Sequence, residues 1–257
     1  MTPSRFLRIA RFELGQFASV GYFVQTVIFA TLSACIVQRL GVLAWHSDPY
    51  LCFLRSAAIG MWTSAISATG IIGFERSKGT LVYLVSGRTN IVMTLVALVS
   101  SVATFSLNSF PLACLFWLIP GRGAVSPAFL GVHLPLLIVG MLLFWLATLS
   151  ITFVMALISV ITPRALAYEG LILTPALFFS GIFPIASPVY RGFETVFSFL
   201  LPTTSATTFL YSYRNPRAMV LSASLCLPVT ALWMVGSRLS AGRAFRAMRT
   251  FGTVEVI

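Results

Sequence analysis

The sequence predicts an all-α membrane protein with several helices that cross the bilayer. Hydrophobic residues make up 58% of the chain and charged residues only 9%, and the mean hydropathy is +0.95. Apolar runs recur along the sequence, and a helix needs about 20 apolar residues to cross the hydrocarbon core. Since no stretch is polar enough for a soluble domain, we expect residues 1–257 to form a single transmembrane domain.

Six apolar runs predict six transmembrane helices, over residues 21–37, 50–74, 91–118, 130–161, 170–185 and 218–236. An even number of crossings places both termini on one side, and lysine and arginine are enriched on the cytoplasmic side. Cytoplasmic termini place 11 of the 17 basic residues inside. The other six lie outside or in the outer part of a span; they are Arg39, Arg55, Arg122, Arg191, Arg214 and Arg217. The net charge of +11 therefore indicates topology, and no nucleic-acid partner is expected.

Basic amphipathic segments are expected at both ends of the chain. Within residues 3–18, Arg5, Arg8 and Arg11 share one helix face, and apolar residues share the opposite face. Such a helix lies in the membrane plane with its arginines toward anionic headgroups. Residues 238–257 form a basic tail with a similar pattern, which we expect in the cytoplasm; a basic flank that only fixes orientation explains it equally well.

The second run contains small residues on one helix face: Gly60, Ser64, Ser67 and Gly70. Small side chains allow another helix to approach closely. This face is a candidate for helix packing within the chain, for a contact with another subunit or for the lining of a pathway. Ionisable groups are scarce near span interiors, where only Glu169 and Arg55 occur, so transport driven by proton or ion coupling is disfavoured.

The fifth run is too short and too irregular for a simple crossing. Its 16 residues make a helix of about 24 Å, against a hydrocarbon core of about 30 Å. Pro175 and Pro184 interrupt it. Amphipathic spacing over 186–214 then predicts short outer or re-entrant helices, a lid over a cavity. The candidate outer gate consists of Ser180, Gly181, Pro184 and Pro202.

Simple residue counts argue against enzymatic activity. Lys78 is the only lysine and follows a serine, so the chain has no GxxxxGKS/T nucleotide loop. The two histidines, His46 and His133, form no HExxH pair, and the four cysteines form no CxxC pair, so neither a metal site nor a cofactor is expected. Ser180 precedes a glycine, but His133 lies upstream of it, the reverse of the order in rhomboid-type serine proteases.

A polar segment, "GIIGFERSKGTLVYLVSGRTN", separates the second and third runs. Within the predicted helix over 75–88, Leu81, Leu84 and Val85 form an apolar face at helical spacing. With cytoplasmic termini this segment is cytoplasmic, where the chain has no soluble part for that face to pack against. We therefore expect it to dock on a partner protein; a turn held at the membrane surface by its own apolar face is the alternative.

These residues resemble the first cytoplasmic loop of the membrane (permease) subunits of type-2 ATP-binding-cassette (ABC) exporters. That loop has an acidic residue, basic residues, Gly-Thr-Leu, apolar residues and a small or polar turn, as in "ERSKGTLVYLVSGRT" over 75–89. The resemblance extends along the chain through an in-plane first helix, six spans, the segments "FFSGIFPI" and "LLPTT", and a basic tail.

The resemblance implies a mechanism and partners. Two membrane subunits, identical or related, each dock this coupling helix on one of two separate ATPase subunits, which bind ATP and Mg²⁺. The residues carried over for docking are Glu75, Arg76, Lys78, Gly79, Thr80, Leu81 and Leu84. The implied location is the bacterial cytoplasmic (inner) membrane, with both termini cytoplasmic.

The cargo implied is apolar or amphipathic, such as a drug, peptide or lipid-like molecule. The Arg-Phe-Glu-Leu run at 11–14 is typical of the drug and peptide branch, and export of lipid-linked polysaccharide remains an alternative. A different class is also open, a channel or a scaffold that does not transport. A channel should conduct without nucleotide, whereas an ABC membrane subunit should be inert without its ATPase.

Overall fold

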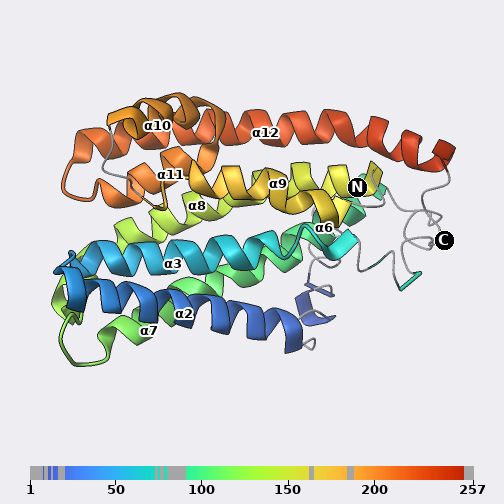
Figure 1. Cartoon of the computed structure of the whole chain (residues 1–257). Coiled ribbons are helices and arrows are strands. Elements are labelled where there is room, and N and C mark those ends of the chain that lie inside the picture. Colours follow the sequence, from blue (N-terminus) through green and yellow to red (C-terminus); the bar gives the residue numbers. More distant parts are fainter. Residues whose placement is uncertain are drawn as a thin grey trace.

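The protein forms an elongated bundle of helices in a computed structural model, which describes residues 8, 11–12, 14–16, 21–72, 75, 78–79, 91–161, 165–183 and 188–251 (Figure 1). Most of the in-plane helix expected over 3–18 lies outside these residues, although residues 8, 11–12 and 14–16 are helical. The described residues form helices and turns without a strand. The all-α prediction is therefore confirmed.

The first two helices of the bundle, α2 (Gly21–Trp45) and α3 (Pro49–Ile66), form a tight hairpin. Asp48 is the N-cap of α3, and its carboxylate accepts a hydrogen bond from the Tyr50 backbone N–H at 2.9 Å. Pro49 suits the first helical position because its φ is already helical and its missing N–H is not needed there.

Helix α2 extends to Trp45, beyond the end predicted at residue 37. The polar residues Gln38 and Arg39 follow the predicted run, and the helix continues through them. The Arg39 guanidinium donates to the Ile119 carbonyl at 3.1 Å and lies 5.6 Å from the centre of the Phe116 ring. Contacts with the loop after α7 thus satisfy this polar side chain without ending α2.

The third apolar run forms three consecutive elements, α6 (Ile91–Thr104), the 3-10 turn η1 (Phe105–Asn108) and α7 (Ser109–Leu118). Ser100, Ser101 and Thr104 each donate a hydroxyl proton to a carbonyl one turn earlier just before η1. Such bonds compete with the helical ladder and are associated with bends. The change to 3-10 geometry follows this cluster.

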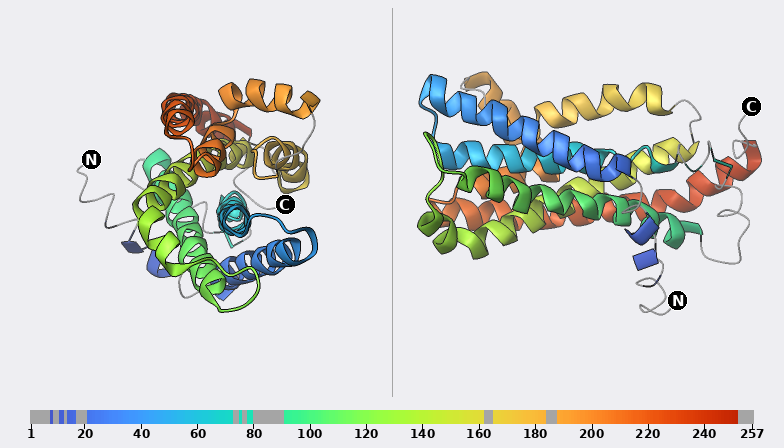
Figure 2. Two further views of the ribbon diagram at one scale, coloured as in Figure 1. Left: turned by 90° about the vertical axis from the view of Figure 1, so that its left-hand side faces the viewer. Right: turned by 90° about the horizontal axis from the view of Figure 1, so that it is seen from below.

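The remaining helices are α8 (Pro127–Ile161), α9 (Ala165–Phe178), α10 (Pro188–Leu200), α11 (Pro202–Tyr211) and α12 (Pro216–Phe251). Helices α8, α9 and α12 each contain an internal proline, at Pro135, Pro175 and Pro228. Helices α8 and α12 pack along each other, and α11 packs against both (Figure 2).

Among the described residues, four helical stretches are long and apolar enough to cross a membrane: Gly21–Trp45, Thr94–Leu118, Pro127–Ser159 and Pro216–Arg243. Helix α3, which carries Arg55, and the 14-residue α9 are not in this set. The structure therefore supports a membrane protein with several apolar helices, and the count of six crossings stays a prediction.

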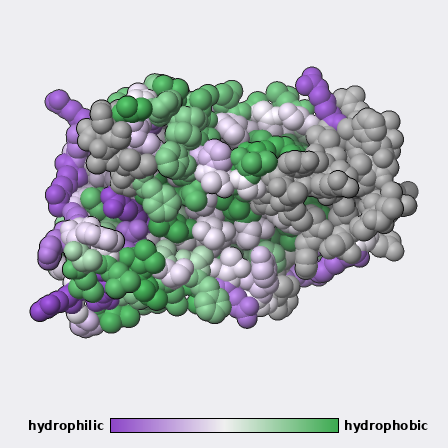
Figure 3. Space-filling model, viewed as in Figure 1, coloured by the Kyte–Doolittle hydropathy of each residue, from purple (hydrophilic) through white to green (hydrophobic). Residues whose placement is uncertain are grey.

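One face of the bundle is largely apolar. Figure 3 shows hydrophobic residues covering much of one face, with hydrophilic residues at its left-hand end. The side chains of Phe29 on α2, Leu171 on α9 and Val220 on α12 are 70%, 71% and 70% exposed. Side chains of this kind are stable outside a core when lipid surrounds them, which agrees with the membrane assignment.

Candidate functional site

Helices α10 and α11 form a short hairpin at the same end of the bundle as the turn between α2 and α3 (Figure 1). Helix α11 is largely buried, including every residue from Pro202 through Thr207. Helix α10 is amphipathic and exposes Phe193, Val196 and Phe199. One helix of the hairpin therefore belongs to the interior, whereas the other has an outward apolar face suited to the membrane interface.

The hairpin supports the non-helical segment that follows α9, residues 179–183. Three hydroxyl groups of α11, spaced by three and four residues, donate to three carbonyls of this segment. Thr204 donates to Phe179 O at 2.7 Å, Thr207 to Ser180 O at 2.6 Å and Tyr211 to Ile182 O at 3.2 Å. Unwound backbone at membrane depth persists only where protein or water satisfies its polar groups, and α11 does so here.

Three of the four predicted gate residues meet around α11. Ser180 is buried and its hydroxyl donates to Leu177 O at 2.6 Å. Gly181 has a φ of +74°, and a Cβ at this position would lie 2.7 Å from the Thr207 hydroxyl oxygen. Pro202 is the first residue of α11. The fourth predicted gate residue, Pro184, lies outside the described residues.

Aromatic contacts fix α10 to the end of α9. The Phe179 and Phe197 rings stack with centroids 3.9 Å apart, and the Tyr190 hydroxyl donates to Phe178 O at 2.7 Å.

His133, the histidine considered together with Ser180 as a protease pair, does not lie beside that serine. Its ring stacks on Phe129 with ring centroids 4.1 Å apart, and its Nδ1 lies 2.9 Å from Phe129 O. Its ring contacts do not involve Ser180, so the described geometry offers no serine–histidine pair.

Helix α3 exposes one strip of side chains along its length. Thr63 is exposed and four residues are partly exposed, whereas every other residue from 50 to 65 is buried; the four are Leu51, Arg55, Ile59 and Ile66. The spacing of four and three residues places them on one helix face. The other faces pack against α2, α7 and α8, and Figure 2 shows α3, in cyan, among the other helices. We call these five residues the α3 strip.

Of the four predicted small residues, only Gly60 and Ser64 lie within α3, and both are buried away from the α3 strip. A Cβ on Gly60 would overlap the Thr31 side chain of α2. Ser64 is buried and donates to Gly60 O at 2.7 Å, and Ser67 donates to Ser64 O at 2.6 Å. Gly70 lies in the turn after α3. At Gly60 the close approach is therefore a contact within the chain, whereas the sequence did not single out the α3 strip.

Only part of the predicted docking segment is described. Glu75 is helical and partly exposed, and Lys78 and Gly79 lie in an exposed turn. Gly79 has a φ of +72°, a conformation that glycine adopts without strain. Arg76, Thr80, Leu81 and Leu84 lie outside the described residues. The end of α3 and the start of α6, which flank the segment, lie at the same end of the bundle as the end of α12 (Figure 1).

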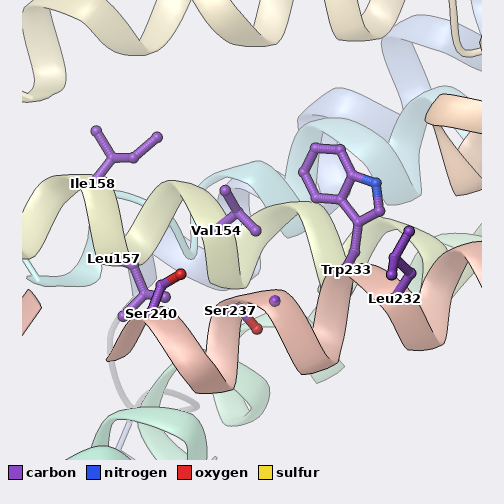
Figure 4. Close-up of a pocket in the computed structure, with 8 residues that line it drawn as sticks. Val154, Leu157, Ile158, Leu232, Trp233, Ser237 and Ser240 are labelled. Carbon is purple, nitrogen blue, oxygen red and sulfur yellow. The ribbon is translucent and has the colours of Figure 1, made fainter. Parts of the chain in front are cut away.

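A groove of about 430 Å³ lies between α8 and α12 and was not predicted from the sequence. Figure 4 shows Trp233, Val154 and Ile158 pointing into the same space. Leu157, Leu232, Gly236, Ser237 and Ser240 complete the lining. Trp233 also donates its indole N–H to Leu200 O at 2.8 Å, so the groove borders the hairpin. The lining is apolar apart from two serine hydroxyls and the indole N–H.

Among the described residues, no three His, Cys, Asp or Glu side chains are grouped to hold a metal ion. The four cysteines, Cys35, Cys52, Cys114 and Cys226, are free thiols. Comparison of the chain with protein-family models finds no match. Comparison with curated proteins and with solved structures finds no match either.

Proposed function

We propose that the chain is the membrane subunit of an ATP-driven exporter of the type-2 ABC class, working with a second membrane subunit and two copies of a separate ATPase subunit. The observation that carries the proposal is the charged, partly apolar segment between two helices of an otherwise apolar bundle, with its resemblance to a coupling loop. The chain has no nucleotide loop, so ATP and Mg²⁺ are bound by the partner.

The proposed topology has six crossings with both termini in the cytoplasm of a bacterial cell. Four crossings are made by the helices that have the required length and composition. Helix α3 makes another, beside α2. Helix α9 makes the sixth together with residues 179–183 and the hairpin, because 14 residues of helix span only about 21 Å.

The docking surface is proposed to be the coupling segment at the cytoplasmic end. Lys78 and Gly79 are exposed there. The positive charges of Lys78 and Arg76 complement acidic residues of the ATPase, and Leu81 and Leu84 supply an apolar face at helical spacing. Glu75 and Thr80 complete the proposed contacts.

The proposed cargo is apolar or amphipathic, because apolar and small polar side chains dominate the helix faces available to it. The second membrane subunit, identical or related, covers apolar surface such as that of α2, where Phe29 is 70% exposed. A pair of subunits also closes the bundle around the α3 strip.

The proposed location of this assembly is the bacterial inner membrane.

Co-purification tests the proposal. The chain is expressed with candidate ABC ATPase subunits from its own genome, as wild type and as the Gly79→Trp, Leu84→Glu double variant. The matched control is Gly192→Trp, Val196→Glu, which makes the same changes on α10. Gly192 has no atom within 4 Å of its Cβ position, and Val196 is 57% exposed, so the control positions have room.

We expect the wild type and the control to retain the ATPase and the coupling-segment variant to lose it, with all three eluting alike in detergent. Equal retention by all three would show that docking lies elsewhere. If the wild type binds no ATPase and conducts ions in liposomes without nucleotide, the channel interpretation replaces the proposal.

A further inference from the structure

Arg55 is a cation within the helical bundle that lacks a negative partner among the described residues. Its Nε atom is buried and makes no hydrogen bond. Its guanidinium carbon lies 5.9 Å from the centre of the Tyr211 ring. No carboxylate of the described part of the chain forms an ion pair with it. An unpaired charge inside a membrane domain is costly, and such residues commonly serve a function.

The chain has few carboxylates that could pair with Arg55, with six acidic against 17 basic residues. Asp48 caps α3 and pairs with Arg214 at 3.4 Å. Glu194 lies on α10 with an oxygen 3.2 Å from the Cβ position of Gly181, and it has interactions of its own. The charges of Arg55 and Glu194 both act on Tyr211 without forming an ion pair with each other.

Arg39 is an arginine of the same protein whose guanidinium has a hydrogen-bond acceptor, and it serves as a comparison for Arg55. Its guanidinium also lies near an aromatic ring, 5.6 Å from the centre of Phe116. However, an N–H of the Arg39 guanidinium donates a hydrogen bond to the Ile119 carbonyl at 3.1 Å. The Tyr211 hydroxyl beside Arg55 donates to Ile182 O at 3.2 Å, and its oxygen and ring lie close to the guanidinium. Tyr211 is neutral, however, so the charge of Arg55 still has no anionic partner among the described residues.

The surroundings of Arg55 suit an amphipathic ligand. Arg55 belongs to the α3 strip, and Leu51 and Ile59 lie one turn away on either side of it. A guanidinium binds carboxylate and phosphate groups through two parallel hydrogen bonds. The strip therefore combines a site for an anionic group with an apolar track along the same helix face.

We propose that Arg55 binds the phosphate or carboxylate group of an amphipathic molecule whose apolar part lies along the α3 strip. Tyr211 holds the guanidinium in place through its ring. The identification of this molecule as the cargo rests on the proposed export function. Binding itself depends only on the membrane chain and can be measured without an ATPase.

Titration calorimetry tests the site on the full chain in a neutral detergent. The probes are decyl phosphate and decyltrimethylammonium, which share a chain length and differ in the sign of charge, both below their micelle concentrations. The variants are Arg55→Gln and Arg55→Lys. Arg39→Gln is the matched control, because it removes an arginine that also lies near a ring.

We expect the wild type to bind decyl phosphate more tightly than the cationic probe. Arg55→Gln should weaken decyl phosphate binding by about tenfold or more, since it removes a charge-assisted pair. Arg55→Lys should retain part of the affinity, and Arg39→Gln should match the wild type. Equal binding by the wild type and the correctly eluting Arg55→Gln variant, or no preference for the anion, would overturn the proposal.

Mass spectrometry of co-purified lipid distinguishes the source of the anion. Anionic phospholipid that co-purifies with the wild type and not with Arg55→Gln identifies a bilayer lipid as the natural ligand. Arg55-dependent binding of decyl phosphate without such lipid indicates a cargo molecule. Failure of this site would leave ATPase co-purification intact, and failure of ATPase docking would leave anion binding intact, so the two proposals fail separately.

Discussion

Arg214 Nη2 lies 3.4 Å from Asp48 Oδ2, and this ion pair joins the turn between α2 and α3 to the turn between α11 and α12. The Tyr213 hydroxyl donates to the same carboxylate oxygen at 3.5 Å. The other oxygen accepts the Tyr50 N–H at 2.9 Å. One carboxylate therefore caps α3 and links the α2–α3 hairpin to the end of α11.

Asp48→Ala should lower the free energy of unfolding by about 1 kcal/mol, mainly through loss of the N-cap. The ion pair contributes less, because the Arg214 side chain is 77% exposed and exposed pairs contribute about 0–1 kcal/mol. Asp48→Asn, which can still cap, is the matched control and should fall between the wild type and Asp48→Ala. Unfolding by added sodium dodecyl sulfate in mixed micelles measures the stability of all three proteins. If Asp48→Asn and Asp48→Ala lose equal stability, the charge of Asp48 and not its role as N-cap is responsible.

Tyr213 should make stability depend on pH in the alkaline range. Partial burial and the neighbouring Asp48 carboxylate raise the pKa of Tyr213, against a smaller opposite effect of Arg214. As pH rises, the unfolded chain therefore loses the hydroxyl proton of Tyr213 before the folded protein does. The contribution of Tyr213 to the free energy of unfolding is complete below the unfolded pKa of about 10, and it is lost as pH rises through the folded pKa. Tyr213→Phe should make the free energy of unfolding less dependent on pH above about 10. An unchanged dependence on pH in this variant would contradict the role of Tyr213.

Gly60→Ala should destabilise the α2–α3 hairpin by about 1–3 kcal/mol, because its Cβ would overlap Thr31 in a close-packed contact. Thr31→Ala should recover much of this loss in the double variant, since the buried Thr31 hydroxyl has no hydrogen-bond partner to lose. Gly131→Ala on α8 is the matched control, because its Cβ position has nothing within 4 Å. Thermal unfolding in detergent measures the series, and additive losses in the double variant would contradict the contact.

Apolar runs predicted where helices lie better than where they end. The run over 91–118 contains α6, η1 and α7, but residues 105–108 give no hydropathy signal for the 3-10 turn. Proline marks the first residue of several helices, including Pro49, Pro127 and Pro202, because its fixed φ suits that position. Hydropathy alone placed the starts of the second and fourth runs at residues 50 and 130.

The sequence predicted where the irregular segment near Ser180 lies, but it did not predict which residues contact that segment. The prolines and the short fifth run indicated an irregular segment near Ser180 and Gly181, because backbone breaks are visible locally in the sequence. The pairing of α11 hydroxyls with the carbonyls of 179–183 joins residues more than 20 positions apart, which no local pattern shows. The α3 strip was not predicted for a related reason. Its five residues have no common chemical type, and they are related only by their exposure in the folded structure.

Gly181→Ala should destabilise the hairpin region by about 1–2 kcal/mol, because a φ of +74° strains a residue with a Cβ. The new Cβ would also press on the Thr207 hydroxyl, which donates to Ser180 O. Gly192→Ala on exposed α10 should be neutral or stabilising. Limited proteolysis between α9 and α12 measures the local effect, and equal cleavage rates for both variants would argue against strain at Gly181.

Cysteine labelling can show whether the α3 strip faces water. Thr63→Cys, on the strip, should react with a charged, membrane-impermeant maleimide, because the thiolate that reacts forms only where water reaches it. Met61→Cys, at a position 1% exposed on the same helix, should stay unlabelled. Leu232→Cys, at a 69% exposed position on α12, should react only with an apolar maleimide if lipid covers it. Cys35, Cys52 and Cys226 are buried but Cys114 is partly exposed, so all variants carry Cys114→Ala to lower the background. Labelling of Thr63→Cys by the apolar reagent alone would place the strip against lipid and remove it from any aqueous pathway.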